Sequence, residues 1–158
     1  MSRVRIQTED FDLSKEVDGL RHEDRGVGAV AAFVGTVRDA DEGRRVQALE
    51  LEHYPGMTER AIESMIDEAL RRFPVRAARV VHRVGRLEAE ERIVLVVVTA
   101  AHRHAAFQAC EFLMDYLKTQ APFWKKETTP DGERWVDARA ADDQALSRWG
   151  LSSGNAAR

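Results

Sequence analysis

Residues 92–119, RIVLVVVTAAHRHAAFQACEFLMDYLKT, decide the fold because they join the most apolar strand candidate to a long amphipathic helix. The first part, Arg92 to Thr99, is apolar at consecutive positions, which is typical of a strand buried on both faces at the centre of a sheet. The second part, His104 to Lys118, places apolar residues three and four positions apart, as a helix packed against a sheet requires. The stretch predicts a helix lying on a central strand.

The rest of the chain adds strands and helices in mixed order, so the predicted fold class is α+β. Met57 to Arg72 has helical spacing, and Pro74 blocks its continuation. A polar loop joins Gly28–Val37 to Val46–His53, which predicts a hairpin with a long connection. Residues 129–132, TPDG, have turn chemistry and predict a terminal hairpin. The other expected elements are a helix over Ser14–Arg21 and strands over Val4–Ile6, Ala78–Val84, Phe123–Thr128 and Glu133–Ala138.

The length of 158 residues fits one domain of ordinary size, expected over residues 1–149. Residues 150–158, GLSSGNAAR, are small and polar and predict a disordered C-terminal tail. The hydrophobic content of 44% and charged content of 32% exclude a disordered or collagen-like chain. The longest apolar runs, at 29–34 and 93–98, are far shorter than the ~20 residues that cross a bilayer.

The charge and the cysteine content indicate the cellular compartment of the protein and the class of ligand that it binds. The single cysteine excludes an intrachain disulfide, and the N-terminus lacks the apolar stretch of a secretory signal, so we expect a cytoplasmic protein. The net charge of −3 argues against a nucleic-acid partner. Residues 102–126 nevertheless carry four cations against two anions. A local basic cluster in an acidic protein indicates a small anionic ligand.

Three other motifs invite a functional interpretation that their context disfavours. Gly26-x-Gly28-x-x-Ala31 matches a dinucleotide fingerprint, but no strand precedes it and no helix follows it. Cys110 sits among apolar helix neighbours, which favours a packed thiol over a nucleophile. His102-x-His104 has no further ligands at metal-binding spacing, so we expect no metal and no cofactor.

The cationic residues together, more than any one of them alone, indicate a functional site. Lys118 and Lys125 are seven residues apart, and His102 and Arg103 stand at the front of the same helix, where backbone N–H groups can hold an anion. Taken singly, His102 and Arg103 are equally explained as a solvated cap. Lys118 alone is better explained as a complement to the helix dipole, and Lys125 as a solvated edge charge. Clustered cations depress one another's proton affinity, which makes a neutral amine available as base or nucleophile. Arg38 and Arg139 could add phosphate-binding forks.

At these residues the chain resembles the large, catalytic subunit of molybdopterin synthase, from about Gly26 to Trp149. The resemblance implies an α/β-hammerhead fold with an additional antiparallel β subdomain. It rests on seven strings in the family's order: FVGTVRD (33–39), LEHYPGM (51–57), VVHRVG (80–85), TAAHR (99–103), MDYLKT (114–119), APFWKKE (121–127) and RWVDAR (134–139).

The resemblance also implies a sulfurtransferase of molybdenum cofactor biosynthesis. Such an enzyme converts cyclic pyranopterin monophosphate to molybdopterin by inserting two dithiolene sulfurs. The sulfur arrives as a thiocarboxylate on the C-terminus of a small, ubiquitin-like sulfur-carrier subunit. The implied assembly is a homodimer core that binds two small subunits as a heterotetramer, with neither nucleic acid nor membrane as a partner. The alternative is a non-catalytic subunit that binds phosphate or nucleotide and uses the same cations only for affinity.

By motif position, the resemblance gives Lys118 and Lys125 as the catalytic residues. It further implies that Arg139 acts in the pocket of the neighbouring protomer. His104 lies outside the pattern and is not included. The implied substrate-binding residues are Thr36, Val37, Arg38, His102, Arg103, Lys126, Glu127 and Arg139.

Overall fold

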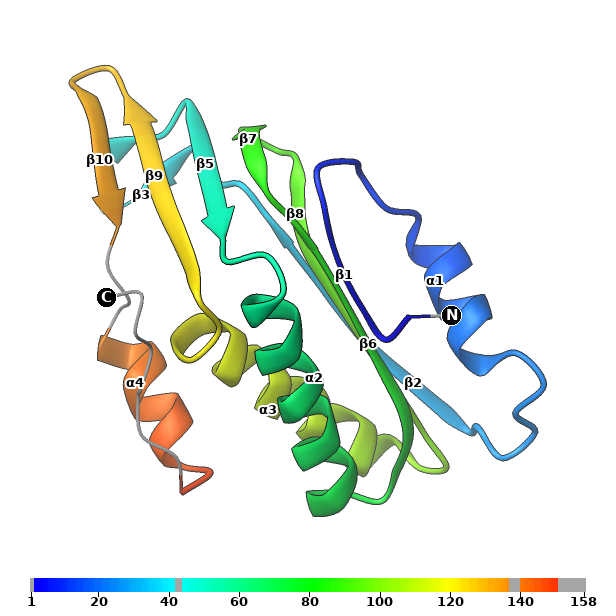
Figure 1. Ribbon diagram of the computed structural model, residues 1–158. Coiled ribbons are helices and arrows are strands. Elements are labelled where there is room, and N and C mark those ends of the chain that lie inside the picture. The colour runs from blue at the N-terminus through cyan, green and yellow to red at the C-terminus, as the bar shows by residue number, and fades with distance from the viewer. Residues whose placement is uncertain (1, 42–43, 137–139, 151–158) are drawn as a thin grey trace.

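The protein combines two four-stranded sheets with helices on both sides of the first sheet (Figure 1). The computed structural model describes residues 2–41, 44–136 and 140–150. Strands and helices alternate irregularly along the chain, and all but one of the strand pairs are antiparallel. The predicted α+β class is confirmed.

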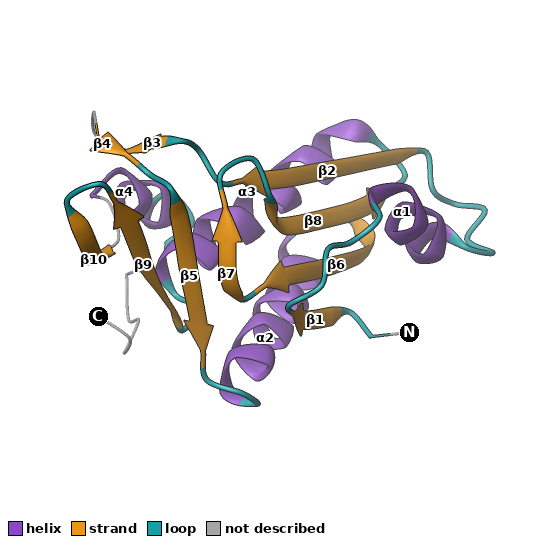
Figure 2. Ribbon diagram, turned by 90° about the horizontal axis from the view of Figure 1, so that it is seen from above, coloured by secondary structure: helices purple, strands orange, loops and turns teal. Residues whose placement is uncertain are grey.

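The first sheet has the strand order β1 (Val4–Gln7), β6 (Val75–Arg83), β8 (Arg92–Ala100) and β2 (Ala29–Thr36). Strand β8 is antiparallel to both of its neighbours, and its residues 95–98 are fully buried. The predicted central strand is therefore confirmed. Strand β2 forms one edge of this sheet, as Figure 2 shows.

Helices cover the two faces of the first sheet unequally. On one face, α2 (Met57–Arg72) and α3 (Arg103–Thr119) bury the main core against the sheet. On the other face, α1 (Leu13–Arg21) covers a smaller cluster that includes Phe11 and Leu95. The helix predicted from Met57 to Arg72 is confirmed at both ends, and α3 extends one residue beyond each predicted end. The apolar pattern alone therefore located both large helices.

The second sheet has the order β10 (Gly132–Val136), β9 (Phe123–Thr129), β5 (Ala48–His53) and β7 (Gly85–Glu88). Strand β10 returns along β9, which confirms the terminal hairpin. The chain passes from β6 in the first sheet to β7 in the second within two residues. Gly85 has φ +88°, a conformation that side chains disfavour, so a glycine suits this bend.

The predicted hairpin between residues 28–37 and 46–53 is wrong. Strand β2 pairs with β8 in the first sheet, whereas β5 pairs with β7 and β9 in the second. The polar loop between them contains a small pair of its own, β3 (Ala40–Asp41) with β4 (Arg44–Arg45). Val37 and Val46 are buried together with residues of the second sheet. Burial of these two valines carries the chain across to the other sheet.

A short helix, α4 (Ala140–Ser147), follows the second sheet and was not predicted. The residues after it dock on α3, where the indole of Trp149 donates a 2.8 Å hydrogen bond to Asp115 and packs edge-on to Phe112. Ala138, all of the predicted tail except Gly150, and Arg139 lie outside the described residues. No helix in the described ranges is long and apolar enough to cross a membrane.

Candidate active site

The C-terminal end of α3 holds Lys118 at a fixed position relative to β9. Lys118 is exposed in the last helical turn. The chain then turns within three residues, and the Gln120 amide donates to the Tyr116 carbonyl at 2.7 Å. The buried Thr58 hydroxyl on α2 donates to the Pro122 carbonyl at 3.0 Å. These bonds anchor the turn, so β9 begins at a defined place beside the end of the helix.

A stacked pair of rings lies beside this turn. His82, near the end of β6, stacks on Phe123, the first residue of β9, with ring centroids 4.0 Å apart and planes inclined by 19°. The His82 Nδ1 atom lies 2.7 Å from the Arg83 carbonyl oxygen. Burial, with smaller contributions from the charges of Lys118 and His53, lowers the pKa of His82 to about 4, although the hydrogen bond to the Arg83 carbonyl opposes the shift. The positive charge of Lys118 is therefore felt at the buried imidazole.

Lys125 follows two residues after Phe123 and shares its face of β9. Its partner in the neighbouring strand is Leu51, which is buried in a small cluster with Val37. The exposed residues Thr36 and Arg38 flank Val37 in the chain. The structure thus brings the segment 36–38 to the face of the sheet that carries Lys125.

Glu127 lies farther along the same face and is only 2% exposed. Its carboxylate forms an ion pair with Arg134 at 3.1 Å. Pairing of this kind is what a buried carboxylate requires, since an isolated buried charge is strongly unfavourable. Glu127 is therefore placed to stabilise the strand pair β9–β10.

Lys126 lies on the opposite face of the second sheet from Lys125, because side chains alternate along a strand. Its ammonium lies 3.3 Å from a carboxylate oxygen of Glu133 and 3.8 Å from one of Glu50. The ammonium also lies over the ring of Trp135, 5.4 Å from its centroid. The structure does not bring Lys126 together with the other predicted site residues.

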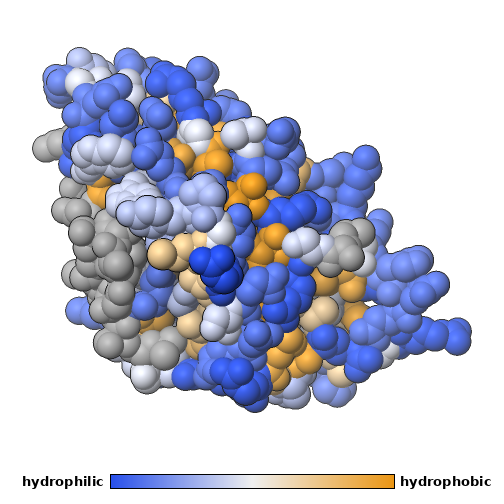
Figure 3. Space-filling view, viewed as in Figure 1, coloured by the Kyte–Doolittle hydropathy of each residue, from blue (hydrophilic) through white to orange (hydrophobic). Residues whose placement is uncertain are grey.

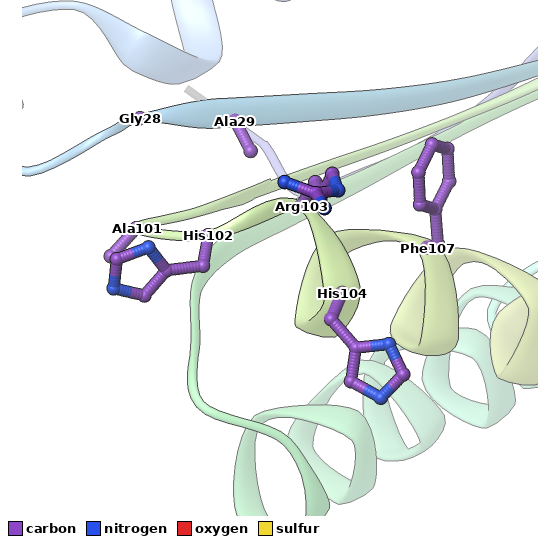
Figure 4. Close-up of a pocket in the computed structure, with 7 residues that line it drawn as sticks. All are labelled: Gly28, Ala29, Ala101, His102, Arg103, His104 and Phe107. Carbon is purple, nitrogen blue, oxygen red and sulfur yellow. The ribbon is translucent and has the colours of Figure 1, made fainter.

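His102 and Arg103 lie at the other end of α3. The helix rises 1.5 Å per residue, so Arg103 and Lys118 are separated by about 22 Å along its axis. The sequence spacing predicts one cationic cluster. Within a single chain, however, the length of α3 separates His102 and Arg103 at one end from Lys118 at the other. A surface hollow near the N-terminal end is lined by Gly28, Ala29, Ala101, His102, Arg103, His104 and Phe107. In Figure 4, Arg103 lies between His102 and Phe107, and His104 points away from β2.

The structure explains two of the motifs that the sequence left aside. A Cβ atom on Gly28 would lie 2.3 Å from the Ala101 carbonyl oxygen, so close packing against β8 requires this glycine. Cys110 is buried, and burial raises the pKa of its thiol to about 11, which confirms the packed thiol. Within the described ranges, no three His, Cys, Asp or Glu side chains are grouped so that they could hold a metal ion.

Reasoning from single residues missed His82. Its signal was a histidine directly after Val80 and Val81 in the predicted strand Ala78–Val84, a place where an ionisable ring requires an explanation.

The face of the molecule drawn in Figure 3 is mostly hydrophilic, with hydrophobic residues visible near its middle.

Comparison with known proteins agrees with this arrangement. The sequence model of the MoaE protein family matches residues 6–120. The molybdopterin synthase catalytic subunit of Ralstonia nicotianae is 54% identical over 156 residues, which cover 99% of this chain and 89% of that protein. The molybdopterin biosynthesis MoaE protein of Burkholderia ambifaria has a structure that superposes with a TM-score of 0.82 at 60% identity. That match covers 96% of this chain and all of the other.

A more distant structure shares the fold alone. It is a protein–protein complex of subunits 1 and 2 of the molybdopterin-converting factor from Helicobacter pylori, with a TM-score of 0.72 at 21% identity, covering 87% of this chain and 92% of the other. The expected α/β-hammerhead fold with an added antiparallel subdomain is the fold shared with these structures. From the family match and the near full-length relatives, the chain belongs to the MoaE family.

Proposed function

We propose that this chain is the catalytic subunit of a molybdopterin synthase, a sulfurtransferase of cytoplasmic molybdenum cofactor biosynthesis. It converts cyclic pyranopterin monophosphate to molybdopterin by inserting two dithiolene sulfurs. The observation that carries the proposal is that Lys118, in the last turn of α3, and Lys125, on β9, lie on either side in sequence of Phe123, whose ring stacks on the buried His82. The family membership of the chain supplies the substrate and the reaction.

The sulfur donor is the thiocarboxylate at the C-terminus of a small sulfur-carrier subunit. The name "catalytic subunit" borne by the Ralstonia relative supports a second kind of subunit. Each sulfur forms a bond to a carbon of the pterin side chain as a C–O bond at that carbon breaks: one carbon releases the phosphate oxygen, which opens the cyclic phosphate, and the other loses its oxygen as water. Water then hydrolyses the acyl–sulfur bond, which leaves a carboxylate on the carrier and the sulfur on the pterin. This exchange requires no oxidant. The two lysines act in proton transfer and at the acyl end of the carrier.

Opening of the cyclic phosphate develops negative charge on oxygen, which fixed cations stabilise. Arg38, in the loop after β2, and Lys125, on β9, approach this region because Val37 and Leu51 are buried together. Thr36 and Val37 would contribute backbone and hydroxyl contacts. Glu127 and Arg139 remain predicted substrate contacts, whereas Lys126 is left out because it lies on the opposite face of the sheet from Lys125.

His102 and Arg103 require a second copy of the chain to reach the same ligand, since α3 separates them from Lys118 by about 22 Å. Strand β2 offers the contact, because within the described residues it pairs only with β8. Its exposed apolar side chains are Val30 and Phe33, and Phe107 on α3 is 64% exposed. Edge strands of this kind recruit another strand.

The direction of such a pairing follows from the register. Ala29 at one end of β2 pairs with Ala100, close to His102, whereas Thr36 at the other end pairs with Arg92. Two β2 strands related by a twofold axis run antiparallel, so the Ala29 end of one lies beside the Thr36 end of the other. Arg103 of one copy would then approach Lys118 of its partner. The complete assembly is a homodimer core with one carrier at each end.

The rival function is a subunit that binds phosphate or nucleotide without catalysis. One observation favours it: the hollow at His102 and Arg103 lies about 22 Å along α3 from Lys118 of its own chain. In that case the cations contribute affinity only, and no reaction depends on Lys118.

The deciding experiment incubates the protein with the cyclic precursor and a thiocarboxylated carrier. We expect dithiolene product from the unmodified protein and from Lys15→Ala, which removes an exposed lysine on α1 as a matched control. We expect none from Lys118→Ala. Binding of the precursor without product would support the rival function.

A further inference from the structure

The hydrogen bonding of His82 fixes which ring nitrogen carries a proton. The Nδ1 atom lies 2.7 Å from the Arg83 carbonyl oxygen. A carbonyl oxygen can only accept, so Nδ1 is the donor, and in a neutral imidazole Nε2 is then left with a lone pair. The ring is 8% exposed, and burial keeps its pKa near 4. At neutral pH, His82 is therefore a neutral acceptor of fixed tautomer.

The position of this ring connects three elements. His82 belongs to β6, its face is covered by the ring of Phe123 at the start of β9, and Lys118 in the last turn of α3 comes five residues before Phe123. His53 on β5 is paired in register with Phe123 and lies at a tilt, with centroids 6.5 Å apart. The charged and titratable groups that act on His82 are thus Lys118 and His53.

A neutral acceptor suits a place beside a reactive amine. It can accept a hydrogen bond from the Lys118 nitrogen in either protonation state, and it adds no charge of its own. Through the stack it also fixes the first residue of β9, two positions before Lys125. The Nε2 acceptor of His82 would thus orient Lys118, and the stack on Phe123 would orient the strand that carries Lys125.

We propose that His82 is a positioning residue of the two-lysine site, which orients the Lys118 amine through Nε2 and the strand of Lys125 through its stack on Phe123. This inference rests on the proposed function, and it adds a residue that touches neither the substrate nor the carrier. A displacement of a reacting group by about 1 Å costs about 100-fold in rate.

The kinetic test compares three variants. His82→Phe keeps a ring that can stack but removes both nitrogens, and we expect kcat to fall about 10- to 100-fold with little change in KM for the precursor. His82→Gln restores an amide that can accept, and we expect a higher kcat than for His82→Phe. His53→Gln is the matched control beside the same phenyl ring, and we expect kcat within about twofold of the unmodified protein.

Two kinetic results would overturn the proposal. One is an unchanged kcat in a folded His82→Phe protein, with folding checked by thermal unfolding. The other is an equal loss in His82→Phe and His53→Gln, which would indicate general packing around Phe123.

A spectroscopic test separates this inference from the proposed function because it needs no turnover. In ¹⁵N-labelled protein, we expect His82 to show the Nδ1–H tautomer and to remain unprotonated from pH 8 to about 5.5. Lys118→Met should shift the Nε2 resonance, whereas Lys15→Met should not. An Nε2–H tautomer, or no response to Lys118→Met, would refute the positioning role even in an active enzyme. The expected response in a protein that makes no product would refute the proposed function alone.

Discussion

The two ends of α3 differ in how firmly they are built. At the C-terminal end, Lys118 lies beside a turn anchored by the buried Thr58 and beside a histidine that is 8% exposed. At the N-terminal end, His102 and Arg103 are exposed, and the N-cap side chain makes no capping hydrogen bond. An enclosed, anchored region suits groups that must hold reacting atoms in place, whereas an open cationic end suits a ligand or a second subunit.

The largest effect is expected from the enclosed end. Lys118→Ala and Lys125→Ala should each lower the rate of product formation by at least about 100-fold, because a group that moves a proton in the transition state contributes that much or more. Both side chains lie at or near segment ends and outside the main core, so the proteins should stay folded. Single-turnover assays with excess carrier would measure the loss.

Circular dichroism and the carrier affinity of each variant serve as controls for these lysine substitutions. Turnover unchanged from the unmodified protein in either variant would remove that lysine from the mechanism.

Substitutions at the N-terminal end of α3 and just after β2 should weaken substrate binding and leave the chemical step largely unchanged. Arg38→Ala and Arg103→Ala should raise KM for the precursor about tenfold with kcat largely retained, because an arginine fork holds phosphate in the ground state as well as in the transition state. Steady-state kinetics across precursor concentrations would separate the two parameters. A fall in kcat at constant KM would instead give these arginines a catalytic role.

The buried His82, near the C-terminal end of α3, should make the stability of the protein depend on pH. The pKa of His82 is lowered from 6.5 to about 4 by burial, so the unfolded chain binds this proton more readily. The stabilisation is fully present above pH 6.5 and falls by up to about 3 kcal/mol as the pH drops to 4. Urea unfolding between pH 7 and 4.5 should therefore show a shallower decline for His82→Phe than for His102→Phe. Equal slopes would contradict the buried, neutral state of His82.

The smallest effect is expected from Lys126. It follows Lys125 in sequence but lies on the opposite face of the sheet, paired with Glu133 and Glu50. Lys126→Ala should change the precursor Kd less than about threefold, and the lost ion pairs should matter little because the partner side chains of Glu50 and Glu133 are 42% and 57% exposed. Isothermal titration with the precursor would measure it. A loss as large as that of Arg38→Ala would restore Lys126 to the binding site.

Much of the fold followed from hydrophobic spacing. The run from Arg92 to Thr99 and the helix after it were located because a central strand and a packed helix leave strong local patterns. The sequence predicted that β2 is the partner of β5, which is wrong. No local pattern distinguishes β2 from the true partners β7 and β9, and only the joint burial of Val37 and Val46 carries β5 into the second sheet. The helix α4 has little apolar periodicity, and it packs on α3 with Leu146 fully buried, a tertiary contact that the local sequence does not show.

The site was predictable in its residues but not in its layout. The motifs identified the lysines, yet sequence spacing gave no measure of the length of helix between Arg103 and Lys118. The alternation that separates Lys125 from Lys126 is visible in the sequence. The stack of His82 on Phe123 joins residues 41 positions apart, a contact that no local pattern encodes.

The central claim is that each working site combines the lysine end of α3 from one copy with the arginine end from another. The direct measurement mixes Lys118→Ala protein with Arg103→Ala protein, allows subunits to exchange, and assays at precursor well below KM. A mixed dimer then holds one site with both defects and one with neither, so about a quarter of all sites should recover after random exchange. If verified mixed dimers recover no activity, Arg103 acts within its own chain or not at all, and the shared site is refuted.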